Sequence, residues 1–421
     1  MSAIRKPIHP AKPIFSGSLN LCKPPSLISA IPPLRRLQCC VIHYGCYCCS
    51  AVSWPPRLFK VSTPRRAKLA CDNTGTCRAA GYANEEDSHG LPVSLLLQLA
   101  AGERAVVSSH LQISYQDNLA RQQTVTELRI NSHTVGRVVF TDQGEGVTKL
   151  PASQTQALLT ALKRRTAISL HTTNGTVWRL SANGATAILR HMDAFQCRNV
   201  TPSALINPGH SRRPVLQPQP LPIIHAAAVP EMPRIQPNSA LANSNSPSMP
   251  MVRVLKRHTP QYRALVQKLR RLPQAKFCEF VDSPEETPKI EAYRLSGGHI
   301  LIRADCMHTA SNDVTQFVTV TNRDFSRIES ILGNKINESY RYDGIISNNW
   351  KERGFGDCWG HENWIWNGRK FSLTYSATDQ MCRGFAGGAW TMPTFISLPT
   401  GTPAAEERAE WIREWLKEYA D

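Results

Sequence analysis

Six cysteines constrain the fold of this chain more than any other feature. They form three couples at short or hairpin range, each inside a stretch with β-strand character: Cys71 with Cys77, Cys278 with Cys306, and Cys358 with Cys382. Disulfides persist in oxidising compartments and are rare in the cytosol. The couples therefore predict three structural disulfides in a protein that works outside the cytosol. Cys197 belongs to none of them.

The net charge of +17 is concentrated at the N-terminus. Residues 1–68 hold 11 Lys or Arg and no Asp or Glu, whereas the rest of the chain holds 38 basic and 32 acidic residues, a net of +6. A basic, cysteine-rich arm of this kind could bind nucleic acid or an anionic membrane surface. We favour the interpretation that the arm is absent from the mature protein, so no nucleic-acid partner is expected.

The arm contains a signal-like segment. An apolar run at 37–53 follows Arg35 and Arg36 and ends in small residues, as a secretory signal does, although the region before it is unusually long. A wrongly chosen start or an upstream frameshift would also give this composition. A zinc site is a third interpretation, but the five cysteines at 39–49 lack paired two-residue spacing, so no metal or cofactor is expected.

No apolar run in the chain reaches the roughly 20 residues that a transmembrane helix needs. No integral membrane span is therefore expected. At 421 residues the chain is also too long for one ordinary core, and two domains with linkers are expected.

The first predicted domain covers residues 69–205. Asp72-Asn73-Thr74-Gly75 is turn chemistry that would bring Cys71 and Cys77 together. Asn174-Gly175 between two apolar runs is a strong hairpin signal. Alternating or β-branched runs predict strands at 93–99, 105–115, 124–130, 136–140, 167–171 and 176–180, and apolar stripes predict helices at 151–165 and 184–195.

A proline-rich linker is predicted at 206–258, since its composition cannot bury enough apolar surface to fold alone. A second β domain follows at 259–398 and begins with a helix, because Thr259-Pro260 is an N-cap followed by a proline at the first helical position. Its predicted strands lie at 277–280, 292–295, 299–306, 316–321 and 340–346, and Asn367-Gly368 predicts a hairpin over 364–371. The pattern of residues 402–421 predicts an amphipathic C-terminal helix. Its polar side is acidic, which disfavours a membrane-surface role.

These elements predict a mainly β protein with a few helices, in the α+β class. It would hold two β-rich domains, the first of them sandwich-like, between a disordered N-terminal arm and a C-terminal helix.

Several stretches of the chain resemble the bacterial family called domain of unknown function eleven-seventy-six. The resemblance rests on LACDNTGTCRAAGY at 69–82, WRLSANGATAILRHM at 178–192, GFGDCWGHENWIWNGRKFSL at 354–373 and CRGFAGGAWTMPTF at 382–395. The first domain is more distantly similar to the invasion-associated locus B proteins. The resemblance implies an exported, periplasmic envelope protein and no particular activity.

Two kinds of site can be read from the sequence. The cluster of Asp357, Cys358, His361 and Glu362 suggests either a Cys-His nucleophile or a metal site. A reduced Cys358 beside His361 could serve an envelope hydrolase or redox enzyme. We expect instead that Cys358 is oxidised and that no residue is catalytic. A possible binding face is formed by aromatic and arginine residues, the side chains typical of interface hot spots: Trp359, Trp364, Trp366, Arg369, Phe385 and Trp390.

The leading hypothesis is therefore an exported, non-enzymatic binding module. Its partner would be an envelope protein or a peptidoglycan or other glycan, and a specific version is the inhibition of a cell-wall lytic enzyme.

Overall fold

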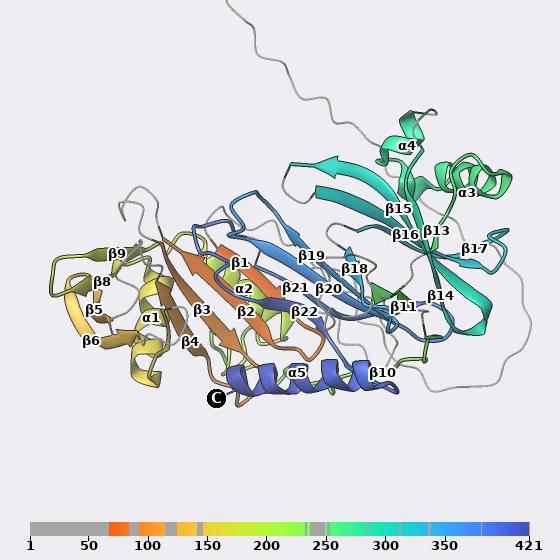
Figure 1. The fold of residues 1–421 in the computed structure, drawn as a ribbon. Coiled ribbons are helices and arrows are strands. Elements are labelled where there is room, and N and C mark those ends of the chain that lie inside the picture. Colours follow the sequence, from red (N-terminus) through yellow and green to blue (C-terminus); the bar gives the residue numbers. More distant parts are fainter. Residues whose placement is uncertain are drawn as a thin grey trace, which may run out of the picture. The chain divides into compact units, whose positions relative to one another are not determined.

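The structure is a computed structural model, and antiparallel sheets dominate it (Figure 1). It describes residues 67–83, 92–113, 124–140, 146–231, 234–235, 249–250, 253–283, 285, 287–310, 313–335, 338–379 and 381–420. The predicted signal-like segment and the cysteine-rich arm lie outside these residues. The mainly β fold class is confirmed, and the described residues belong to one unit that starts at Cys46.

The chain first forms a five-stranded antiparallel sheet. In spatial order its strands are β1 (Ala67–Cys71), β2 (Cys77–Tyr82), β3 (Val93–Leu99), β4 (Ser108–Ile113) and β7 (Val147–Lys149). The Asp72 carboxylate accepts the backbone N–H of Thr74 at 2.9 Å, which fixes the turn between β1 and β2. Cys71 and Cys77 lie opposite each other in the register and form a disulfide, as the turn chemistry predicted.

A second sheet and two helices complete this region. The sheet has the order β6 (His133–Phe140), β5 (Thr124–Ile130), β8 (Ile168–Thr172) and β9 (Val177–Leu180). Helices α1 (Ala152–Arg164) and α2 (Ala185–Phe195) bury their apolar stripes in one core with both sheets, as Leu97, Leu128, Leu158 and Ile188 illustrate. The strand expected at 105–115 is shorter than predicted, because the backbone joins the ladder only from Ser108.

The first half of the predicted linker is held against both β-rich regions. Gln219 N–H donates to Thr74 at 3.0 Å, and Ala227 N–H donates to Trp366 at 2.8 Å. Between these contacts β10 (Ile223–His225) pairs in parallel with β23 (Leu398–Thr400). This stretch is extended, as its prolines favour, but its backbone is anchored on both sides rather than solvated along its length. A short ladder of β11 (Arg234–Ile235) and β12 (Met249–Pro250) follows.

The second region is a sandwich of two five-stranded sheets. The first has the order β13 (Arg253–Val254), β14 (Ile290–Arg294), β15 (His299–Thr309), β16 (Asp313–Asn322) and β17 (Ile328–Lys335). The second has the order β18 (Glu338–Tyr340), β19 (Ile345–Lys351), β20 (Trp359–Trp366), β21 (Phe371–Thr378) and β22 (Met392–Ile396). Tyr293, Leu301 and Val318 of one sheet share a buried cluster with Ile346 and Trp366 of the other.

Short helical elements flank the first of these sheets. They are α3 (Pro260–Arg270), η1 (Pro273–Ala275), α4 (Glu279–Asp282) and η2 (Ser296–Gly298). The Thr259 hydroxyl caps α3 by accepting the Tyr262 N–H at 3.2 Å, as predicted. Two disulfides brace the sandwich, Cys278–Cys306 beside α4 and Cys358–Cys382 in the second sheet's loops.

Two predicted strands are wrong. Residues 277–280 do not form a strand, because Cys278 N–H bonds to Ala275 and Val281 N–H bonds to Cys278 in successive local turns that lead into α4. The alternation at 340–346 also crosses a turn. Tyr340 ends β18, the Asp343 carboxylate accepts the Ile345 N–H at 2.9 Å, and Gly344 takes φ +84° before β19 begins. Local hydrogen bonds therefore outweigh the apolar alternation in both places.

Loop 381–391 docks onto the five-stranded sheet of β1, β2, β3, β4 and β7. Met381, Phe385, Ala389 and Trp390 share a buried cluster with residues of β2 and β3, including Tyr82. The indole N–H of Trp390 donates to the Ser94 hydroxyl at 2.7 Å, although the two residues lie 296 positions apart. These contacts make the loop part of the core between the two β-rich regions.

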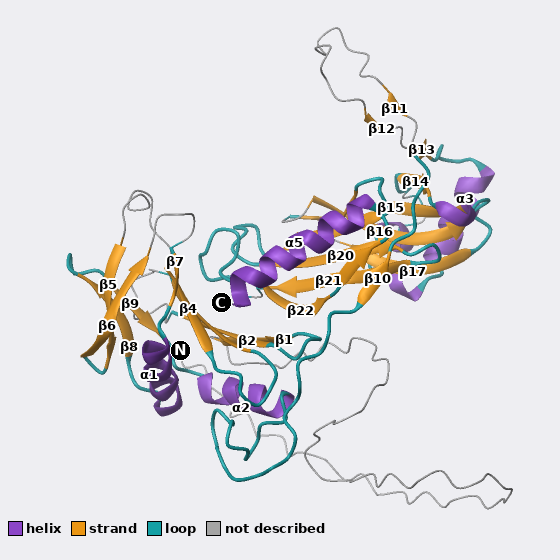
Figure 2. Cartoon of the chain, turned by 90° about the horizontal axis from the view of Figure 1, so that it is seen from below, coloured by secondary structure: helices purple, strands orange, loops and turns teal. Residues whose placement is uncertain are grey.

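The C-terminal helix α5 (Pro403–Ala420) packs along the sheet of β18, β19, β20, β21 and β22 (Figure 2). Ala405, Ala409 and Ile412 are buried, Trp411 meets Tyr375 edge-on at 5.5 Å, and the Arg78 guanidinium lies 5.4 Å from the Trp415 ring. The helix thus contacts both the sandwich of the second region and strand β2. No helix within the described part of the chain is long and apolar enough to cross a membrane.

We expect Trp390→Ala to lower the free energy of unfolding by about 3–5 kcal/mol, because it removes a buried aromatic ring between two sheets. Chemical denaturation of the oxidised protein measures this change. Phe355→Ala is the matched control, since Phe355 is 88% exposed and its loss should change stability by less than about 0.5 kcal/mol. Equal effects of the two variants would contradict the packing role of Trp390.

Candidate binding surface at the Cys358–Cys382 disulfide

The loop between β19 and β20, residues 352–358, has a backbone fixed by hydrogen bonds at several points. We call it the Phe355 loop. Glu352 N–H donates to Cys358 at 3.0 Å, and Gly356 N–H donates to Arg353 at 3.1 Å. Gly387 of the opposite loop donates its N–H to Gly356 at 3.0 Å, so the Phe355 loop and loop 381–391 support each other.

Asp357 ties the same two loops together through its side chain. Its carboxylate receives Arg353 Nε at 2.7 Å and Arg353 Nη2 at 2.5 Å, a bidentate pair, and also receives the Gly384 N–H at 2.7 Å. Burial alone would raise the pKa of Asp357, but the hydrogen bonds from Arg353 and Gly384 hold it below its ordinary value. The carboxylate therefore stays charged and keeps all of these partners.

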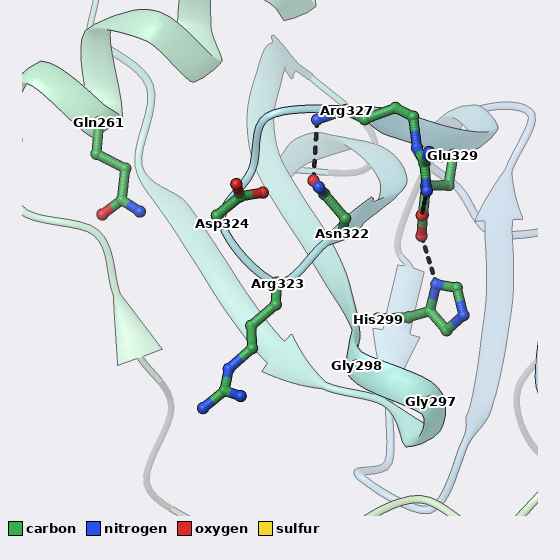
Figure 3. A pocket seen from close by; sticks show the side chains of 9 residues that line it. All are labelled: Gln261, Gly297, Gly298, His299, Asn322, Arg323, Asp324, Arg327 and Glu329. Atoms are coloured by element: carbon green, nitrogen blue, oxygen red, sulfur yellow. Dashed lines mark hydrogen bonds and ion pairs between the residues drawn. The ribbon is translucent and has the colours of Figure 1, made fainter.

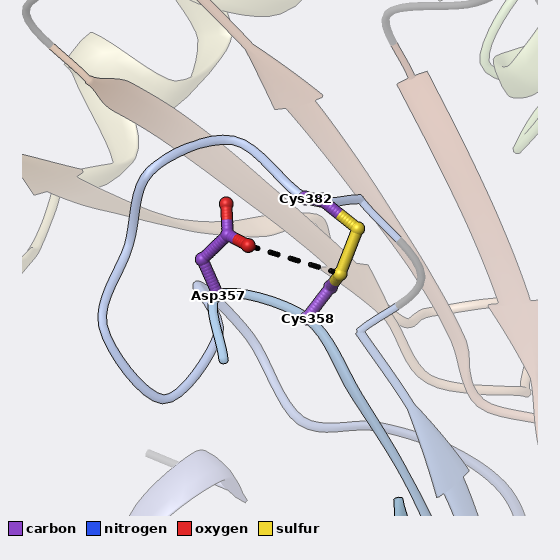
Figure 4. A group of neighbouring side chains, drawn as sticks. All are labelled: Asp357, Cys358 and Cys382. Carbon is purple, nitrogen blue, oxygen red and sulfur yellow. Dashed lines mark hydrogen bonds between the residues drawn. A yellow bond between two sulfur atoms is a disulfide. The ribbon is translucent and has the colours of Figure 1, made fainter. Parts of the chain in front are cut away.

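The Cys358–Cys382 disulfide bears on both interpretations of this cluster, the nucleophile and the metal site. The ligand atoms of Asp357, Cys358 and Cys382 lie within 4.8 Å of one another, which would suit a metal ion if both sulfurs were thiolates (Figure 4). The sulfurs are instead bonded to each other, so they offer neither thiolate ligands nor a nucleophile for His361. The Asp357 Oδ1 to Cys358 Sγ separation of 4.0 Å is a contact, since a disulfide sulfur carries no hydrogen to donate.

Asp379 is a buried carboxyl beside this disulfide. It accepts the Trp359 N–H with one oxygen, and a Cβ atom on Gly388 would lie 1.6 Å from the other, so only glycine fits at 388. Burial raises the pKa of Asp379 to about 7, with further increases from the nearby charges of Asp357 and Glu352. Asp379 therefore titrates near neutral pH, which its sequence context did not indicate.

A partly exposed sheet face borders the Phe355 loop, and we call it the Trp359 face. It comprises Asn349 and Lys351 of β19 and, opposite them in register, His361 and Trp359 of β20. The Asn349 side-chain oxygen lies 2.7 Å from His361 Nδ1, so this nitrogen is the donor, and burial lowers the pKa of His361. The Lys351 ammonium lies 5.5 Å from the Trp359 ring, while the indole N–H donates to Gly356 at 2.8 Å.

Phe355 is the most exposed large apolar side chain of the described residues, at 88%. The Arg353 guanidinium lies 5.5 Å from the ring, so the same arginine contacts Phe355 and the Asp357 carboxylate. The sequence hypothesis did not include Phe355. The sequence signal for this exposure is a phenylalanine between two glycines, three residues before a disulfide cysteine, because the adjacent glycines have no side chains to cover it.

The six residues proposed as a binding face do not form one surface. Trp366, Phe385 and Trp390 are buried core residues, which corrects that hypothesis for these three. Trp364 lies on the opposite side of β20 from Trp359, under the Lys335 ammonium at 4.8 Å, because strand residues five apart point to opposite faces. Arg369 is exposed in the Asn367-Gly368 hairpin. Of the six proposed residues, Trp359 is therefore the one that belongs to the Trp359 face.

Comparison with known proteins identifies a family. The model of the family described as "Protein of unknown function (DUF1176)" matches residues 63–397, a range that includes all three disulfides, the Phe355 loop and the Trp359 face. No curated protein matches the chain, and no solved structure matches it. The resemblance of the first domain to the locus B proteins is not tested by these matches and stays a prediction.

We expect Asp379→Asn to change how stability depends on pH. The pKa of Asp379 is about 7 in the folded protein and near 4 when unfolded, so the folded state binds the extra proton between these values. Its contribution to the free energy of unfolding is therefore full below about pH 4 and is lost as the pH rises through 7.

The variant should be more stable than the parent at pH 8 by about 1–3 kcal/mol and should lose this part of the pH dependence. Denaturant titrations between pH 4 and 8 measure both effects. Glu410→Gln on the exposed side of α5 is the control. Parallel stability profiles for Asp379→Asn and the parent would show that Asp379 titrates at its ordinary value.

Proposed function

We propose that this chain, which belongs to the DUF1176 family of proteins of unknown function, is a periplasmic, non-enzymatic binding module. Three disulfides indicate a protein outside the cytosol, and the periplasm is the envelope compartment that supports their formation. The family description carries no activity over to the chain, so the proposal rests on the chain's own residues.

The observation that carries the proposal is the rigid presentation of Phe355. A phenylalanine that is 88% exposed is unfavourable in a free protein, yet the surrounding backbone is held by the disulfide, the Arg353–Asp357 pair and the contact of Gly356 with Gly387. Binding through such a loop loses little conformational entropy, because the anchor is already in place. Aromatic anchors of this kind dominate binding energy in many protein interfaces.

The partner that fits a projecting aromatic loop is a protein with a concave apolar pocket. The Lys351 ammonium and the Trp359 ring flank the loop and would contact the rim of that pocket. A specific version is the inhibition of a cell-wall lytic enzyme, whose substrate cleft is concave. Direct binding of peptidoglycan by the Trp359 face is the competing outcome, since tryptophan rings also stack on sugars.

We expect the purified, oxidised full chain to slow the hydrolysis of peptidoglycan by a lysozyme-type muramidase. Phe355→Ala should weaken this inhibition at least about tenfold, which corresponds to the loss of one interface anchor. Turbidity of a peptidoglycan suspension measures the rate. Phe277→Ala is the matched control, because Phe277 is also largely exposed but lies beside α4.

Sedimentation with insoluble peptidoglycan, without the enzyme, separates the two partners. Sedimentation that Trp359→Ala abolishes and Phe355→Ala preserves would replace the protein partner by a glycan. A chain that neither sediments with peptidoglycan nor slows the muramidase would refute the lytic-enzyme version.

A further inference from the structure

A hollow of about 670 Å³ lies at one end of the β13–β17 sheet, separate from the Phe355 loop (Figure 3). Two turns form its walls. The turn between β14 and β15 contributes Gly297 and Gly298, and the turn between β16 and β17 contributes residues 322–327. Gln261, in the first turn of α3, faces the hollow from the other side. The hollow is broadly open to solvent, and its volume is enough to seat a small organic ligand.

The acidic groups that line the hollow are satisfied within the protein. The Asp324 carboxylate accepts the Ser326 N–H at 3.1 Å in its own turn. The Glu329 carboxylate is held from two sides, by Arg327 Nη2 at 2.6 Å and by His299 Nδ1, whose ring also rests edge-on against Trp366. These contacts engage both carboxylates, and Arg327 also compensates the charge of Glu329, whereas Asp324 is held by a neutral N–H.

The donors that line it are not all used. Arg323 and Gln261 have no hydrogen-bond or ion-pair partner within the described part of the chain, and both side chains are exposed. Arg327 uses one guanidinium nitrogen for Glu329, and its side chain is 72% exposed. The Arg323 guanidinium and the Gln261 amide therefore line the hollow with N–H groups available to a ligand, whereas the Arg327 guanidinium is turned toward Glu329 (Figure 3).

Further positive charge surrounds the same turn. The Lys268 ammonium donates to the Phe325 carbonyl at 3.0 Å, and the Arg253 guanidinium lies 5.7 Å from the Phe325 ring. Both charges lie close to residues 322–327 without an acidic partner among the described residues. Positive charge around a concave site raises the local concentration of anions.

We propose that this hollow binds a small anion rich in acceptor oxygens, bearing a carboxylate or a phosphate. Arg323 holds the anionic group, since a planar guanidinium matches the oxygens of both carboxylate and phosphate, and Arg327 adds positive charge from its place beside Glu329. The Gln261 amide donates to a neighbouring oxygen of the ligand. This site lies on a different sheet from the Phe355 loop and does not depend on the function proposed for that loop.

Calorimetric titration of the oxidised full chain tests the proposal with two probes, N-acetylmuramic acid for the carboxylate and glycerol 3-phosphate for the phosphate. We expect saturable binding of at least one probe, and the stronger of the two identifies the anionic group. Arg323→Gln should weaken that binding about tenfold, the effect of losing one charged hydrogen-bonding partner. Higher salt should weaken it as well.

Arg104→Gln is the matched control, because Arg104 is an exposed arginine between β3 and β4, in the other β-rich region. It should leave the affinity unchanged, and circular dichroism should show that both variants keep the fold. Absence of saturable binding for both probes would overturn the proposal. Binding that Arg323→Gln and Arg104→Gln affect equally would overturn it too, because the anion would then bind elsewhere.

Discussion

The Cys358–Cys382 disulfide and the Asp357 carboxylate beside it hold together two loops of the sandwich, the Phe355 loop and loop 381–391. One loop carries the buried residues Phe385 and Trp390 onto the first sheet, and the other exposes Phe355. Asp357 links the two, because it binds Arg353 of one loop and Gly384 of the other. The docking of the two β-rich regions and the presentation of the aromatic anchor thus depend on the same short set of contacts.

This arrangement explains why the motif resembling a family signature is so dense in glycine, aromatic and cysteine residues. Gly388 leaves room for the buried Asp379 carboxyl, and Trp390 reaches Ser94 across the interface. The stretch from Gly354 to Trp390 therefore combines a structural joint with an exposed loop. Its composition alone does not separate the two roles, because both use aromatic residues.

Local chemistry allowed much of the fold to be predicted. The turn at Asp72, the cap at Thr259 and the hairpin at Asn367-Gly368 rely on hydrogen bonds between near neighbours, and all three form as expected. The three disulfides join short sequence separations and were also predicted. The strand expected at 277–280 failed because successive turns satisfied the same backbone groups.

The surface could not be predicted in the same way. Whether an aromatic residue is buried depends on partners far along the chain, as Trp390 and Ser94 show. The anchoring of residues 219–227 likewise depends on Thr74 and Trp366, which lie in different regions. The titration of Asp379 follows from burial and the surrounding charges, which only the folded chain brings together.

Hydrogen–deuterium exchange of the loop amides tests whether the disulfide preorganises the Phe355 loop. In the oxidised protein the amides of Glu352, Gly356, Gly384 and Gly387 should exchange slowly, because each donates to a defined acceptor. In the Cys358→Ser/Cys382→Ser variant the same amides should exchange much faster, while the amides of β3 stay protected. Fast exchange of these four amides in the oxidised protein would show that the Phe355 loop is not preorganised.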